Sequence, residues 1–187
     1  EEYVQNLYDT MAWLNINWDE GGPKGGEYGP YVQSERFELY KEYAMKLVEK
    51  GEAYYCFCDA ERLDRIRLLQ TKNKMPPGYD RNCRHLTPEE VQANLDAGKF
   101  NDALLGDIEW KNEDISPDPV LLKSDGFPTY HLANIIDDHF MKITHVMRAQ
   151  EWIPSTPLHV QMYKAFGWEH PEFCHLPMVN GSDGKKL

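Results

Sequence analysis

The chain has 187 residues, enough for one large domain or for one domain that carries an insertion. No stretch approaches the ~20 consecutive apolar residues of a membrane span, and the first residues show no signal-peptide pattern. A soluble cytoplasmic protein without a membrane partner is therefore expected. The formal net charge of -11 disfavours nucleic acid as a ligand, but segment 61–85 is locally basic, with seven Lys and Arg against three Asp and Glu. This segment is a candidate basic patch, although a solvated helix face is the commoner meaning of a charge run.

Periodicity and capping signals predict two helices at the start of the chain. Apolar residues at helical spacing predict helices over 2–14 and 34–50. Ser34 is expected to cap the second helix, and Gly51 is expected to end it in a left-handed conformation. Between them, the Gly- and Pro-rich run at 21–30 predicts a loop.

The next part of the chain predicts one strand and two further helices. An aromatic run at 53–57 favours a strand, and a basic helix is expected over 59–72. The Thr-Pro-Glu-Glu sequence at 87–90 combines a capping hydroxyl, a proline in the first turn and the glutamate of a capping box. A helix is therefore expected from there to about residue 97, with Gly98 ending it.

From Pro119 onward, strands alternate with helices. The pattern predicts, in order, a strand at 120–123, a turn at 124–126, a helix at 131–141, a buried strand at 143–147, a helix at 156–167 and a strand at 173–179. This alternation implies parallel βαβ units. Because ligands of such sheets bind beyond the carboxyl ends of the strands, Arg148 is expected where a substrate would lie.

Three of the four cysteines and one histidine form two close pairs. Cys56 pairs with Cys58 as C-x-C, and Cys83 pairs with His85 as C-x-H after a long loop. Two such pairs fit the ligand set of a tetrahedral zinc site. Only Cys174 is left over, which argues against a disulfide framework and for a reducing compartment. The alternative is that the residues are scattered buried thiols and a surface histidine.

Three stretches of the chain carry a family resemblance. They read YGPYVQSER at 28–36, LLKSDGFPTYHLAN at 121–134 and RAQEW at 148–152. Together with the Cys and His pairs, and in the same order along the chain, they closely resemble the catalytic domain of bacterial glutamyl-tRNA synthetases. The resemblance covers nearly the whole chain.

This resemblance implies a class I aminoacyl-tRNA synthetase with an α/β fold. The expected architecture is a doubly wound, Rossmann-like nucleotide-binding domain, interrupted by an α+β insertion that carries zinc and binds the tRNA acceptor stem. Residues 1–53 and 128–187 would belong to the catalytic domain, and residues 54–127 would form the insertion. The catalytic domain would be incomplete, because the family's His-Ile-Gly-His-like first signature has no counterpart here.

The implied activity is that of a glutamate–tRNA ligase. ATP activates L-glutamate to glutamyl-adenylate, and the glutamyl group passes to the 3' end of tRNA(Glu). The implied cofactors are ATP, magnesium and zinc, and a monomer is expected. Because the first signature, an N-terminal arginine and the anticodon-binding region have no counterpart in these residues, the chain alone is expected not to form the adenylate.

The resemblance also implies roles for individual residues. These are, for glutamate, Tyr130, Asn134 and Arg148; for ATP, Glu151, Trp152, Met178 and Lys186; for catalysis, Lys186; for tRNA, Arg62 and Arg65; and for zinc, Cys56, Cys58, Cys83 and His85. A planar guanidinium matches both oxygens of a carboxylate, which suits Arg148 to an acidic substrate. Tyr130 and Asn134 lie four residues apart, so one helix face would present both side chains.

Other functions remain open at this point. A glutamyl-queuosine tRNA synthetase paralogue shares the metal pairs and the strand pattern, whereas glutaminyl-tRNA synthetases usually lack the metal pairs. From a different class, the chain could be a non-catalytic, zinc-stapled RNA-binding module. In a third reading, the zinc stabilises the fold and has no role in RNA contact.

Overall fold

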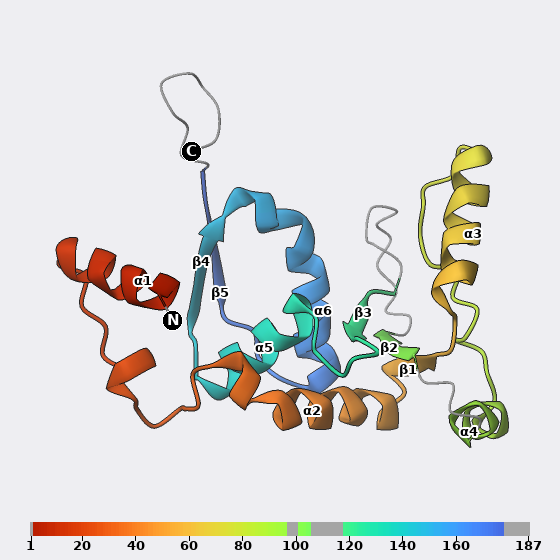
Figure 1. The fold of residues 1–187 in the computed structure, drawn as a ribbon, viewed down its shortest axis with the longest axis horizontal. Coiled ribbons are helices and arrows are strands. Elements are labelled where there is room, and N and C mark those ends of the chain that lie inside the picture. The colour runs from red at the N-terminus through yellow and green to blue at the C-terminus, as the bar shows by residue number, and fades with distance from the viewer. Residues whose placement is uncertain (1, 97–100, 106–117, 178–187) are drawn as a thin grey trace. The chain divides into compact units, whose positions relative to one another are not determined.

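The computed structural model describes residues 2–96, 101–105 and 118–177 (Figure 1). The chain divides into two compact units, Glu1–Arg36 and Phe37–Leu187. The helices are α1 Glu2–Trp13, α2 Phe37–Glu49, α3 Ala60–Lys72, α4 Pro88–Asp96, α5 Tyr130–Phe140 and α6 Thr156–Phe166, with short 3-10 segments at Gly22–Lys24, Gln33–Glu35 and Gln150–Ser155. The strands are β1 Ala53–Cys56, β2 Asn101–Leu105, β3 Val120–Leu122, β4 His145–Ala149 and β5 Glu172–Leu176.

The first unit consists of α1 and the loop that follows it. α1 confirms the helix predicted at the start of the chain. In the loop, the Glu20 carboxylate accepts hydrogen bonds from the Tyr28 backbone N–H at 2.7 Å and from the Tyr31 hydroxyl. Near its end, Arg36 Nη1 donates to the Pro30 carbonyl at 3.0 Å. These contacts satisfy polar groups in a segment whose glycines and prolines prevent regular structure.

Helices α2, α5 and α6 supply most of the core of the second unit. α2 packs against α5, and α5 packs against α6 (Figure 1). Fully or nearly fully buried side chains of this core are Tyr40, Ala44, Leu47, Leu132, Ile135, Ile136, Met162 and Tyr163. α2 begins at Phe37, later than predicted, because Ser34 lies in a separate 3-10 turn and does not cap the helix. Gly51 does have a positive φ of 75°, as its place after the helix predicted.

An antiparallel sheet includes Cys56, the first of the metal-binding candidates, at the end of β1. Its strand order is β1-β2-β3, with both neighbouring pairs antiparallel. The sequence analysis predicted β1 and β3 but not β2. α3 begins after Asp59, whose side chain accepts a hydrogen bond from the Arg62 backbone N–H at 2.7 Å. α4 begins with the predicted capping box, in which Thr87 and Glu90 exchange hydrogen bonds of 2.8 and 3.2 Å. The predicted end at Gly98 lies outside the described residues.

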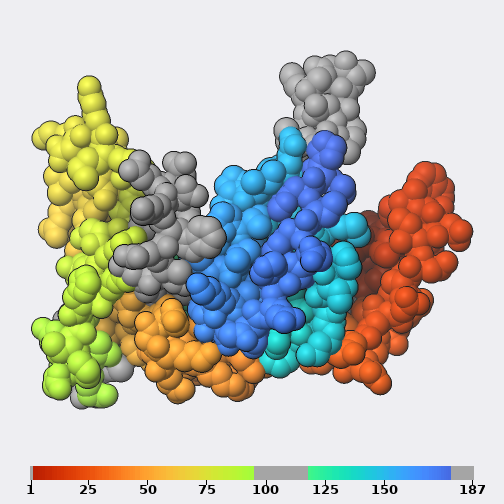
Figure 2. Space-filling view, turned by 180° about the vertical axis from the view of Figure 1, so that it is seen from behind, coloured from red at the N-terminus to blue at the C-terminus, as the bar shows by residue number. Residues whose placement is uncertain are grey.

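The parallel βαβ unit predicted for the second half is confirmed. β4 and β5 pair in parallel, and α6 lies between them in the sequence. β4 begins two residues later than predicted, because the Ile143 backbone N–H still bonds to the Asp138 carbonyl of α5. The prediction that this strand is fully buried is wrong: its exposure alternates, and Met147 is 71% exposed. β5 alternates in the same way, and Figure 2 shows the blue segment that includes it at the surface.

The described helices were also compared with the requirements of a membrane span. None of them is long and apolar enough to cross a bilayer.

A buried hydrogen bond between α2 and α5 gives a stability prediction. Tyr40 is 0% exposed, and its hydroxyl donates to both Asp137 oxygens, at 2.7 and 2.9 Å. Tyr40→Phe should lower the free energy of unfolding by about 1–3 kcal/mol, because the carboxylate loses a donor that water cannot fully replace. Urea unfolding of the 187-residue chain measures this. Tyr3→Phe is the matched control, since Tyr3 is 88% exposed. Equal stabilities for the two variants would contradict the prediction.

Candidate active site and metal centre

Arg148 lies at the centre of a polar cluster at the carboxyl end of β4. Its Nε donates to His175 Nε2 at 3.2 Å, its Nη2 donates to Thr156 Oγ1 at 2.7 Å, and its Nη1 lies 3.1 Å from His159 Nδ1. The Phe173 ring lies under the guanidinium, 5.2 Å from its carbon. The predicted strand-exit arginine is therefore half-buried and held in one orientation by polar groups.

The βαβ connection brings these partners together. In the parallel register, Arg148 of β4 lies opposite His175 of β5. Thr156 is the first residue of α6, and His159 follows it by three positions, so both face the same side of the helix. α6 therefore contributes two acceptors and β5 contributes one to the same guanidinium.

Three further predicted residues gather beside this cluster. The Asn134 side-chain amide donates to the Tyr130 hydroxyl at 3.2 Å, as their spacing on α5 predicted. The Tyr130 ring lies 4.7 Å from the Trp152 ring and 6.2 Å from the His159 ring, measured between centroids. Tyr130 is 46% exposed, so this group opens to solvent. Through His159, it adjoins Arg148.

The remaining predicted residues of the active site are Glu151, Met178 and Lys186. Glu151 is exposed in the 3-10 segment, next to Trp152. Met178 and Lys186 lie outside the described residues. A hollow of about 490 Å³ adjoins the Arg148 cluster, and its lining residues are Ile153, Thr156, Pro157, Val160, Phe173 and His175.

Two histidines that were not predicted as site residues, His131 and His159, lie in this site and have lowered pKa values. His159 is 0% exposed, and burial, followed by the charge of Arg148, lowers its pKa to about 3. Its Nε2 lies 2.9 Å from Nδ1 of His131, whose pKa burial and Arg148 also lower. Both imidazoles are therefore neutral near pH 7. The available signal was weak: His131 lies inside the LLKSDGFPTYHLAN run, but nothing in the sequence marks His159 as a partner of Arg148.

The three predicted cysteines meet in one buried cluster. The sulphur atoms of Cys56, Cys58 and Cys83 all lie within 4.8 Å of one another, and Cys58 and Cys83 are 3.6 Å apart. The Tyr79 hydroxyl lies 3.3 Å from Cys56 Sγ and 3.6 Å from Cys58 Sγ. His85 is exposed and is not part of this cluster within the described residues. The Tyr79 phenol, which was not predicted from the sequence, therefore lies beside the sulphur atoms, where it could be a fourth ligand.

The chain turns around Cys83, between the end of α3 and the start of α4. The Arg84 backbone N–H bonds to the Arg81 carbonyl at 3.1 Å, so this segment turns immediately around Cys83. Tyr79 precedes Cys83 by four residues, and its hydroxyl accepts a hydrogen bond from the Cys83 backbone N–H at 3.1 Å. Within the described residues, only the three cysteines form a group of ligand atoms here, and His85 is not part of it.

The donor set of this cluster fits zinc. Zn–S bonds of about 2.3 Å in a tetrahedron place sulphur atoms about 3.8 Å apart, close to the separation of Cys58 and Cys83. At Cys83, hydrogen bonds favour thiolate: the Phe57 backbone N–H points at Cys83 Sγ at 3.3 Å, and a hydrogen bond with Cys56 is the main cause that holds the Cys83 pKa well below its usual range. Three thiols and one phenol could hold a metal ion here.

The two arginines predicted to contact tRNA have different surroundings on α3. Arg62 forms a two-pronged ion pair with Asp80, at 3.1 and 2.6 Å, and donates to Cys58 Sγ at 3.2 Å. This pair also holds the pKa of the Asp80 carboxyl below its usual range. Arg65 is exposed. Arg62 therefore contacts the cysteine cluster and Asp80, whereas Arg65 faces solvent.

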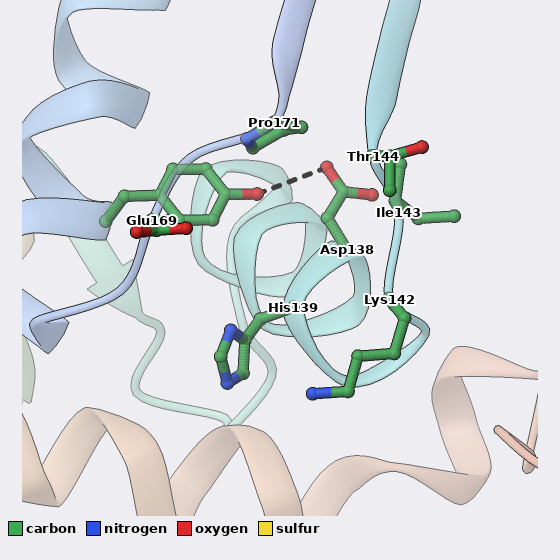
Figure 3. Close-up of a pocket in the computed structure, with 8 residues that line it drawn as sticks. Asp138, His139, Lys142, Ile143, Thr144, Glu169 and Pro171 are labelled. Carbon is green, nitrogen blue, oxygen red and sulfur yellow. Dashed lines mark hydrogen bonds between the residues drawn. The ribbon is translucent and has the colours of Figure 1, made fainter.

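A second hollow, of about 230 Å³, lies where α5 leads into β4 (Figure 3). The Asp138 carboxylate points toward the Tyr163 hydroxyl, 3.5 Å away. Burial, followed by repulsion from Asp137, raises the pKa of Asp138 to about 6. This carboxyl is thus costly to ionise in the folded chain.

The metal cluster gives a test of its fourth ligand. Tyr79→Phe should weaken zinc binding at least about tenfold, because it removes an oxygen beside the sulphur atoms, whereas His85→Ala should leave zinc binding unchanged. Zinc content after dialysis against a chelator of known affinity measures this in the 187-residue chain. Cys58→Ser should lose zinc in the same assay. The opposite ranking of Tyr79→Phe and His85→Ala would restore His85 as the ligand.

The buried carboxyl gives a pH prediction. Folded Asp138 keeps its proton up to about pH 6, whereas an aspartate in the unfolded chain loses it near pH 4. Stability is therefore lost as the pH rises through this window, because the folded state binds more protons. Asp138→Asn should remove this loss. The difference in free energy of unfolding between the variant and the unmodified chain should therefore favour the variant more at pH 7 than at pH 4. Thermal unfolding at both pH values tests it, with exposed Asp19→Asn as the control. No change in the pH dependence would contradict it.

Known proteins resemble the whole of this chain. A family model described as tRNA synthetases class I (E and Q), catalytic domain, matches residues 1–187. The glutamate–tRNA ligase of Treponema denticola is 70% identical over 202 residues, which cover 100% of this chain and 40% of that protein. The ligase of Borreliella burgdorferi is 57% identical over 201 residues, with 100% and 41% covered.

A solved structure agrees. The crystal structure of a glutamate tRNA ligase from Elizabethkingia meningosepticum in complex with its amino acid matches with a TM-score of 0.87 and 36% identity, covering 98% of this chain and 41% of that chain. This chain thus spans about 40% of the length of its relatives. With its mixed α/β fold and a family match over all its residues, the chain belongs to the catalytic domains of the class I tRNA synthetases for glutamate and glutamine.

Proposed function

We propose that the protein containing this chain is a glutamate–tRNA ligase, which activates L-glutamate with ATP and transfers it to the 3' end of tRNA(Glu). The observation that carries this proposal is the half-buried guanidinium of Arg148, whose three acceptors within the described chain are all uncharged side chains. A cation held in this way favours an anionic ligand. The similar proteins of known function that span this chain are ligases for the same amino acid.

Recognition of glutamate would use both polar and aromatic groups. The guanidinium of Arg148 supplies charge and a planar pair of donors for a carboxylate. Tyr130 and Asn134 lie on the open side of the cluster and could bind the remaining polar groups of the amino acid. Chemistry of this kind needs positioning and charge stabilisation more than covalent participation by the protein.

ATP binding would occur next to the glutamate site. Trp152 offers a flat apolar surface beside Tyr130, and Glu151 precedes it on the same exposed segment. We assign Met178 and Lys186 to the same nucleotide, with Lys186 as a charge-stabilising group and magnesium as the counter-ion of the phosphates. The β4–α6–β5 unit supports a doubly wound catalytic domain, for which we propose residues 1–53 and 128–187.

The insertion, residues 54–127 in this proposal, would meet the acceptor stem of tRNA. Zinc, held by Cys56, Cys58, Cys83 and Tyr79, would fix the end of β1 to the segment after α3. Arg65 of α3 is then the candidate for phosphate contact, and Arg62 acts through Asp80 and the cluster. A non-catalytic RNA-binding module would need none of the arrangement around Arg148, which favours the ligase.

The proposal is tested in the full-length enzyme that contains this chain. Arg148→Ala should raise the KM for glutamate about 100-fold or more, since a hydrogen-bonded charge is lost from the site. Arg148→Lys should recover only part of this loss, because an ammonium lacks the planar fork. Aminoacylation of a tRNA(Glu) transcript measures both variants.

The control for this experiment is Lys164→Ala, an exposed residue of α6. It should charge tRNA(Glu) like the unmodified enzyme. The proposed function is wrong if the unmodified enzyme does not join glutamate to tRNA(Glu), or if Arg148→Ala leaves the KM for glutamate unchanged.

A further inference from the structure

The direction of every hydrogen bond around His159 can be assigned. A guanidinium has donors and no acceptor, so the 3.1 Å contact between Arg148 Nη1 and His159 Nδ1 requires Nδ1 to accept. The proton of neutral His159 must then be on Nε2. That N–H lies 2.9 Å from His131 Nδ1, which must accept it in turn. The three side chains form one directed chain of hydrogen bonds from Arg148 through His159 to His131.

The same logic fixes the charge around Arg148. His175 Nε2 accepts from Arg148 Nε, so this imidazole is also neutral in the arrangement seen here, and Thr156 offers a hydroxyl. Within the described residues, three of the five N–H groups of the guanidinium therefore meet uncharged acceptors. The other two, one on each terminal nitrogen, are left for a further ligand. An acidic partner in the place of His159 would have neutralised the cation before the ligand arrived.

Burial makes His159 suitable for this role. The ring is 0% exposed, which keeps water from competing for Nδ1 and disfavours the doubly protonated form. That form could not accept from Arg148 and would place a second cation beside it. Burial lowers the pKa of His131 as well, so both imidazoles stay neutral near pH 7 and the hydrogen bonds keep their direction.

We propose that His159 is a positioning residue for glutamate recognition: its Nδ1 orients the Arg148 guanidinium without neutralising it, and His131 fixes the required tautomer. This inference rests on the proposed function, because it assumes that Arg148 binds the glutamate carboxylate. It predicts that the KM for glutamate depends more on an acceptor facing Arg148 than on the size or polarity of residue 159.

Two nearly isosteric substitutions separate the two sides of the ring. In His159→Asn, the amide oxygen is attached to Cγ, as Nδ1 is in histidine, so an acceptor toward Arg148 is retained. In His159→Gln, the amide lies one bond further out, near the place of Nε2, so the contact toward His131 is retained and Arg148 Nη1 loses its acceptor. In the full-length enzyme, we expect the KM for glutamate to rise about tenfold or more in the Gln variant and clearly less in the Asn variant. The KM for ATP should stay near its original value in both.

Aminoacylation of tRNA(Glu) at varied glutamate gives these constants, and circular dichroism shows that both variants are folded. An equal rise in the two variants, or a larger rise for Asn, would overturn the proposal, because a merely structural histidine would not distinguish the two sides of its ring. Failure of the unmodified enzyme to charge tRNA(Glu) would instead remove the proposed function, and this inference with it.

The partly buried His131 provides a second pair if a change at His159 prevents folding. His131→Asn keeps an acceptor for the His159 N–H, and His131→Leu removes it, which releases the tautomer. We expect a higher KM for glutamate in the Leu variant than in the Asn variant. Equal KM values would show that the tautomer of His159 does not set the orientation of Arg148, and they would contradict the proposed positioning role.

Discussion

The β4–α6–β5 unit depends on one interaction: the positively charged guanidinium of Arg148 is held by uncharged hydrogen-bond acceptors. Withdrawing a guanidinium from water is unfavourable unless its donors find partners. Here the partners come from β5 and from the first turn of α6, which parallel pairing and the βαβ connection place beside β4. The fold thus provides hydrogen-bond partners for Arg148 while leaving its charge available for an anionic ligand.

Much of the backbone follows from local signals, and the exceptions share a physical cause. The capping box at Thr87, the left-handed Gly51 and the βαβ alternation were all confirmed, because each depends on residues close in sequence. β2 was not predicted, since Asn101 and its neighbours have little intrinsic strand preference and owe their conformation to pairing with β1 and β3. The prediction that β4 is buried was wrong for a similar reason. An apolar run does not indicate which other parts of the chain cover each face of the strand.

The candidate sites show the same division. Residue types and spacing were sufficient to predict three cysteines in one cluster and the Tyr130–Asn134 contact on one helical turn. They were insufficient to show that the Tyr79 hydroxyl lies beside the sulphur atoms, because Tyr79 stands outside the two predicted pairs. Nor could composition show that Arg62 is engaged by Asp80, so that part of the basic patch serves the cluster itself.

The two candidate sites differ in how their charged groups are compensated. In the cysteine cluster, Arg62 donates to Cys58 Sγ, and a bound zinc ion would balance the negative charge of thiolate ligands. Such a site is complete in itself and suits a structural role. Arg148, in contrast, is held by a hydroxyl and two imidazoles, so its hydrogen bonds are only partly satisfied and its charge is not balanced. A site of that kind is complete only when an anion binds, and for this reason we propose Arg148 for ligand recognition and the cysteines for stabilising the fold.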